Sequence, residues 1–168
     1  MKLAFTLFLA GFILTASAQS FSVPKNVKMD KAEDFEKYHE DILACINWLQ
    51  ETPITKEEKK RKDASAFFLR WVTGTPYITM TIYAGTLFYV EDNPDLMTIF
   101  LGGWAKYALE NPDEKDNQLE GNMAGIKAVI AFYEANKKNM KRDKQLEKLA
   151  KKDDAALREW VQEQMQAE

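Results

Sequence analysis

One stretch of the sequence, residues 93–112, constrains the fold more than any other. It begins with an Asn-Pro pair at 93–94 and ends with another at 111–112, and such pairs are typical of the start and the end of a helix. Gly102 and Gly103 each lower helix stability by about 1 kcal/mol relative to alanine, so we expect a neighbouring helix to approach closely there. A helix with so little polar surface must be surrounded by other elements, and we expect it at the centre of the fold. Its apolar residues are Leu96, Met97, Ile99, Phe100, Leu101, Trp104, Tyr107, Ala108 and Leu109.

Apolar residues recur at helical spacing in five other parts of the chain. Asp30 and Thr55 are expected to cap the first two helices, because a glutamate follows each of them three residues later. Asp153 or Asp154 is expected to cap the last helix. The sequence therefore predicts an all-α fold, a compact orthogonal bundle of five to seven helices. The expected helices besides the central one span 30–51, 55–74, 116–136, 141–151 and 154–165.

A short internal echo links two of these helices. The segment Trp48-Leu49-Gln50-Glu51-Thr52-Pro53 recurs as Trp71-Val72-Thr73-Gly74-Thr75-Pro76. Two stacked helix hairpins would produce this echo, and so would two unrelated helices that end by the same chemistry. No third copy follows, which favours the second explanation.

Residues 77–90 do not fit the helical pattern. Ile78, Met80 and Ile82 alternate with Thr79 and Thr81, a spacing that is typical of a strand. However, no second convincing strand is present, and a lone strand has no obvious partner for its backbone hydrogen bonds. We therefore expect an irregular or extended segment near 77–90, with a brief helical turn over 86–90.

The first 18 residues have the features of a cleaved signal peptide. Lys2 precedes an apolar core, and small residues at positions 16–18 predict cleavage between Ala18 and Gln19. The apolar core is shorter than the roughly 20 residues of a membrane span, so no transmembrane segment is expected after cleavage. We expect an exported, periplasmic or secreted protein. Its parts would be the signal peptide 1–18, a leader segment 19–29 and a single helical domain 30–168.

The residues that could support catalysis are few. His39 is the single histidine and lacks the second histidine of a helical zinc motif, so we expect it on an acidic helix surface. Cys45 lies among apolar helix positions and is expected to be buried and inert. No phosphate-binding glycine loop is present. We expect no catalytic residue, no metal ligand and no cofactor.

Two sets of residues are candidates for binding. A run of positive charge at 56–62 is either a solvated helix face or an interaction patch for an acidic partner, and its lack of interleaved aromatic residues argues against nucleic acid. The formal net charge of −3 also argues against it. Irregular segments often carry function, so a ligand groove is expected beside 77–90. The groove candidates are Tyr77, Tyr83, Trp104 and Tyr107, and the patch candidates are Lys56, Lys59, Lys60, Arg61 and Lys62.

The stretch Phe100-Leu101-Gly102-Gly103-Trp104-Ala105-Lys106-Tyr107-Ala108-Leu109-Glu110-Asn111 resembles a segment of small exported proteins of unknown function from Bacteroidota-type bacteria. The Ser-Ala-Gln end of the signal peptide and the Trp-x-x-x-Thr-Pro helix ends are similar too. The resemblance implies an exported bacterial helical domain, and it implies no activity or binding residues.

Export, an aromatic irregular segment and segregated charge favour a binding or protein-interaction module of the cell envelope, with an unidentified envelope protein or small ligand as its partner. One alternative is a small hydrolase with an acidic site formed by distant residues, which would need converging carboxylates or His39 facing one of them. The other is a structural or stress protein of the envelope, which would need an exposed apolar patch and a stable oligomer.

Overall fold

The computed structural model describes residues 21–167 and is all-helical over that range, with no strand. This confirms the predicted all-α bundle. The predicted signal peptide and its cleavage site at Ala18 and Gln19 lie outside the described residues. The α-helices are α1 (Ala32–Glu36), α2 (His39–Glu51), α3 (Glu58–Gly74), α4 (Asp95–Glu110), α5 (Gln118–Asn136), α6 (Lys144–Leu149) and α7 (Asp154–Gln166). The 3-10 helices are η1 (Ala84–Leu87), η2 (Pro112–Glu114) and η3 (Lys137–Asn139).

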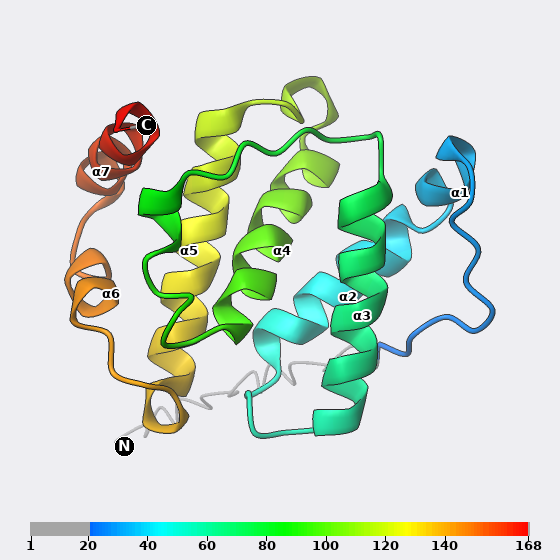
Figure 1. Ribbon diagram of the computed structural model, residues 1–168, viewed down its shortest axis with the longest axis horizontal. Coiled ribbons are helices and arrows are strands. Elements are labelled where there is room, and N and C mark those ends of the chain that lie inside the picture. Colours follow the sequence, from blue (N-terminus) through cyan, green and yellow to red (C-terminus); the bar gives the residue numbers. More distant parts are fainter. Residues whose placement is uncertain (1–20, 168) are drawn as a thin grey trace, which may run out of the picture.

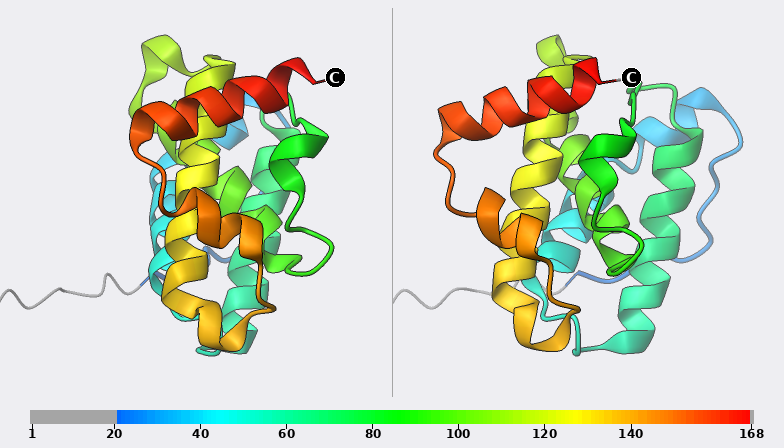
Figure 2. Two further views of the ribbon diagram at one scale, coloured as in Figure 1. Left: turned by 90° about the vertical axis from the view of Figure 1, so that its left-hand side faces the viewer. Right: turned by 60° about the vertical axis from the view of Figure 1, so that its left-hand side comes forward.

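Helix α4 lies at the centre of the bundle, as its sequence predicts. It packs between α3 and α5, and α2 crosses this group of helices (Figure 1). Helices α6 and α7 cover the outer side of α5, with α7 crossing it at a steep angle (Figure 2). The glycine pair of α4 lies at two close approaches, because Gly102 faces Ile46 on α2 and Gly103 faces the backbone of α5 at Ala124.

The first predicted helix is divided in two. Helix α1 ends at Glu36 and α2 begins at His39, so the expected continuous helix over 30–51 is wrong at residues 37–38. The expected cap at Asp30 is wrong as well. Asp34 instead folds back, and its carboxylate accepts hydrogen bonds from the backbone N–H groups of Asp30 (3.3 Å) and Lys31 (3.2 Å). Lys31 is the N-cap residue of α1, so its bond to Asp34 satisfies a backbone donor at the start of the helix, as in a capping box.

Two other predicted helix starts also differ. Helix α3 begins at Glu58 rather than at Thr55, after Glu57, which has a left-handed backbone with φ 48°. Asn93 does not cap α4 with its side chain. Its amide group instead exchanges hydrogen bonds with the backbone of Lys141, at 3.0 and 2.9 Å, and so fixes the start of α4 to the chain that enters α6.

Helix ends follow the sequence more closely. The backbone N–H of Thr52 donates to the carbonyl of Trp48 at 3.0 Å, and that of Thr75 donates to Trp71 at 2.9 Å. Both threonines then adopt extended angles before a proline, so the echo in the sequence reflects one way of ending a helix. Asp153 caps α7 as predicted and accepts from the N–H of Ala156 at 2.8 Å.

Candidate binding surfaces

The basic run at 56–62 does not form a uniform positive patch. Lys60 pairs with Glu57 at 3.5 Å, and Lys62 pairs with Glu58 at 3.1 Å. Lys56 and Lys59 are exposed, and no ion pair links either of them to another described residue. The charge that this run presents to a partner is therefore mixed.

Arg61 is half-buried, and its guanidinium has a structural role. Its guanidinium donates to the carbonyl oxygens of Leu49 (3.1 Å), Pro53 (3.4 Å) and Thr52, at the C-terminal end of α2. These carbonyls have no partner within the helix and carry the negative end of its dipole, which explains the position of a cation there. The predicted patch role of Arg61 is therefore wrong, because its side chain points into the α2–α3 corner.

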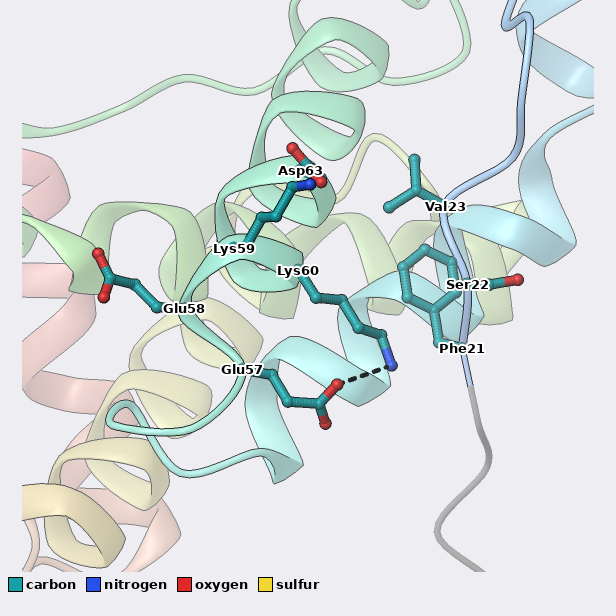
Figure 3. A pocket seen from close by; sticks show the side chains of 8 residues that line it. All are labelled: Phe21, Ser22, Val23, Glu57, Glu58, Lys59, Lys60 and Asp63. Carbon is teal, nitrogen blue, oxygen red and sulfur yellow. Dashed lines mark ion pairs between the residues drawn. The ribbon is translucent and has the colours of Figure 1, made fainter.

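The leader segment forms one wall of a groove along α3 (Figure 3). Phe21 and Val23 lie on the leader, opposite Lys60 and Asp63 on α3, and Glu58 points away from the leader. The hollow between them has a volume of about 700 Å³. Phe21 is itself buried against Trp48, with ring centroids 6.3 Å apart, and this contact attaches the leader to α2.

A second hollow extends the first along the same face of α3. It has a volume of about 390 Å³ and shares Val23 and Asp63 with the first. Val27, Ala66 and Phe67 add apolar surface. We call the two hollows together the leader groove. Its lining residues are Phe21, Ser22, Val23, Val27, Glu57, Glu58, Lys59, Lys60, Asp63, Ala66, Phe67 and Arg70.

Two of these residues, Lys59 and Lys60, were candidates from the sequence. The contribution of the leader segment to the groove was not predicted. The available signal was the recurrence of Phe21, Val23, Val27 and Met29 in a segment that has no helical period. Large apolar residues in such a segment indicate that it packs on the domain. Phe21 and Met29 are 6% and 7% exposed and confirm this packing.

The four aromatic candidates do not form a common groove. Trp104 is 0% exposed between α4 and α5, so it presents no surface to a ligand, and its expected place in a ligand groove is wrong. Tyr107 donates a hydrogen bond from its hydroxyl to Glu114 at 3.1 Å. Tyr77 lines a small hollow of about 180 Å³ together with Glu36 and Lys115. Tyr83 is half-buried at the start of η1.

Residues 77–83 form an extended segment that runs from the end of α3 to η1 across the bundle (Figure 1). Side chains just before α5 and at its first residue hydrogen-bond to one edge of it. Lys115 donates to the carbonyl of Tyr77 at 2.8 Å, and Asp116 accepts from the N–H of Thr79 at 3.3 Å. Gln118 both donates to the carbonyl of Thr79 and accepts from the N–H of Thr81, each at 2.8 Å. Three side chains thus replace the missing neighbouring strand along this edge.

The single histidine is half-buried, and its expected place on an acidic surface is wrong. The ring of His39 packs against Tyr77 and Trp71, with centroid separations of 4.5 and 5.7 Å. Its Nε2 atom is buried and has no hydrogen-bond partner among the described residues. Burial lowers the pKa of His39, and the charge of Glu36 opposes this effect. A neutral imidazole with aromatic neighbours is a packing residue here.

The other chemistry of the described residues is also structural. Cys45 is buried, donates to the carbonyl of Ala64 at 3.4 Å, and has a pKa raised by burial to about 12. This confirms its predicted burial. The hydrogen bond from Arg158 to Glu120 lowers the pKa of that carboxyl. The described residues contain no group of three or more histidine, cysteine, aspartate or glutamate side chains that could hold a metal ion.

No helix among residues 21–167 is both long enough and apolar enough to span a membrane. Comparison of the chain with protein-family models, with curated proteins and with solved structures finds no match.

Proposed function

We propose that this chain is an exported protein-interaction module that binds an extended polypeptide segment in the leader groove. One observation carries the proposal: two hollows lie in line along α3, with an apolar floor and charges of both signs at the rim. The groove follows α3 from Glu57 to Arg70, which at the rise of a helix is about 20 Å. An extended peptide of about six residues has that length.

The charges of the groove favour a polypeptide over a purely anionic ligand. Lys59 and Arg70 are offset by Asp63 and Glu57 along the same rim. A nucleic acid or an anionic membrane surface would meet these carboxylates and be repelled. A polypeptide can instead place apolar side chains on Phe67 and Val27 and match both signs of charge at its flanks.

The alternative of a hydrolase gains little from the geometry. Glu114 binds the hydroxyl of Tyr107 and also accepts from Asn117 at 3.2 Å. Glu120 is held by both terminal nitrogens of Arg158, at 2.6 and 3.0 Å. Carboxylates that are occupied in this way are poorly placed to divide the roles of general acid and general base.

Site-specific photo-crosslinking in the native envelope tests the proposal. A photoreactive amino acid at Ala66, an exposed position that lines the groove and also a separate hollow of about 600 Å³ beside Pro94, is compared with the same amino acid at Ala135, an exposed position on α5. We expect a polypeptide adduct from position 66 alone, and mass spectrometry of its proteolytic fragments would identify the bound segment.

A charge reversal then links the adduct to the groove. Lys59→Glu should weaken the adduct, because it removes an exposed cation at the rim that has no internal ion pair. Lys148→Glu, an exposed lysine on α6, is the matched control and should leave the adduct unchanged. Equal adducts from positions 66 and 135, or an adduct that proteases do not digest, would show that the groove does not bind a polypeptide.

A further inference from the structure

The extended segment 77–83 has a second edge that no part of the described chain pairs with. In an extended chain the backbone groups of alternate residues point to opposite edges. Tyr77, Thr79 and Thr81 use the edge that Lys115, Asp116 and Gln118 occupy. The N–H and C=O groups of Ile78, Met80 and Ile82 therefore point to the other edge. Among the described residues these groups have no hydrogen-bond partner.

The sequence of this segment is the same in both directions. It reads Tyr-Ile-Thr-Met-Thr-Ile-Tyr, with Met80 at its centre. When two copies of such a segment run antiparallel about Met80, each residue faces one of its own type. Thr79 of one copy faces Thr81 of the other, and Tyr77 faces Tyr83. Paired threonines and paired aromatic residues are favourable neighbours across strands.

We propose that two copies of this chain associate through this open edge, as an antiparallel pair with a two-fold axis at Met80. The proposal does not depend on the leader groove, which is formed by other residues. Ile78, Met80 and Ile82 would exchange about six backbone hydrogen bonds across the axis. The interface is isologous, so it closes after two copies and does not propagate into a fibre.

The segment lacks the features by which proteins usually prevent such pairing. Exposed edges commonly carry lysine, proline or an inward-pointing charge. Residues 77–83 contain none of these, and Ile82 is the most exposed large apolar residue of the described chain, at 39%. A pair of short edges buries less area than a permanent dimer, so the association should be reversible with concentration.

The test measures molar mass by sedimentation equilibrium. The full chain is expressed with its predicted signal peptide, and the protein is purified after export. Between about 1 µM and 1 mM, the range over which small interfaces associate, the mass of the wild-type protein should rise toward twice that of the monomer. Thr79→Lys/Thr81→Lys should stay monomeric, because an antiparallel pair would place the introduced lysines opposite each other. Both threonines are exposed, so circular dichroism and thermal unfolding should show that the variant still folds.

A second variant tests the register. In Thr79→Lys/Thr81→Glu, the introduced lysine of one copy would face the introduced glutamate of the other, so the dimer should persist. An equal mixture of Thr79→Lys/Thr81→Lys with Thr79→Glu/Thr81→Glu should also regain the doubled mass. A protein that is monomeric at 1 mM would overturn the proposal. So would a dimer that survives in Thr79→Lys/Thr81→Lys alone.

Discussion

The contact between α4 and α5 at Gly103 yields the sharpest prediction of stability. A Cβ atom at position 103 would lie 2.6 Å from the carbonyl oxygen of Ala124, 2.8 Å from the Cβ of Ala128 and 3.0 Å from the Cα of Gly125. Two of these three atoms are backbone, so the helices must separate for Gly103→Ala to be accommodated. Overpacking of this kind costs about 1–3 kcal/mol, and the better helix propensity of alanine returns about 1 kcal/mol. Because backbone atoms cause the clash, the cost should fall in the upper half of that range, about 2–3 kcal/mol, and we expect a net loss of about 1–2 kcal/mol.

The neighbouring glycine is the matched control. A Cβ atom at position 102 would lie 3.3 Å from the Cγ2 of Ile46 and 3.5 Å from the Nε2 of Gln50, both on side chains. Small side-chain shifts can absorb these contacts, so the gain in helix propensity should dominate in Gly102→Ala. In thermal unfolding, Gly103→Ala should lower Tm by about 3–8 °C, whereas Gly102→Ala should leave it unchanged or raise it slightly. Equal shifts in the two variants would refute the proposed close approach at α5.

Two further predictions concern groups whose roles the sequence did not reveal. Arg61→Lys should lower the free energy of unfolding by about 2 kcal/mol in urea titrations. A lysine ammonium cannot reach all three carbonyls that the guanidinium binds, those of Leu49, Thr52 and Pro53. The control is Lys62→Ala at the next, exposed position, which should change the free energy of unfolding little. His39 has a lowered pKa in the folded protein, so as the pH falls below 6.5 the unfolded chain gains a proton first and the native state loses stability. His39→Phe should therefore unfold with a weaker pH dependence than the wild type between about pH 7 and 5, and an unchanged dependence would contradict the burial of this histidine.

The parts of the fold that sequence predicts well depend on short-range chemistry. The all-round apolar pattern of residues 96–109 predicted a central helix, because such a surface is stable only when other elements cover it. The ends of α2 and α3 were predicted from Pro53 and Pro76, because a proline restricts the chain before it whatever surrounds it. The cap of α7 at Asp153 is likewise a bond within four residues.

The errors have a common physical origin in contacts between distant parts of the chain. Arg61 belongs by sequence to a run of lysines, yet carbonyls 8 to 12 residues earlier in the chain bind its guanidinium. Trp104 belongs to the apolar central helix and was also a candidate for the ligand groove, but it is fully buried against Gly121 of α5. The leader groove needs both residues 21–27 and α3, which no local pattern connects. The candidate site was therefore only partly predictable.

Residues 77–83 show how a local signal can be correct and still be misjudged. The alternation around Met80 predicts a strand, and the objection was that a lone strand leaves its backbone groups without partners. The structure answers that objection for one edge, where Lys115, Asp116 and Gln118 reach the segment from about 37 residues away. At the other edge, the backbone groups of Ile78, Met80 and Ile82 have no hydrogen-bond partner among the described residues. This second edge is the one that we propose pairs with another copy of the chain, because no described residue hydrogen-bonds to it.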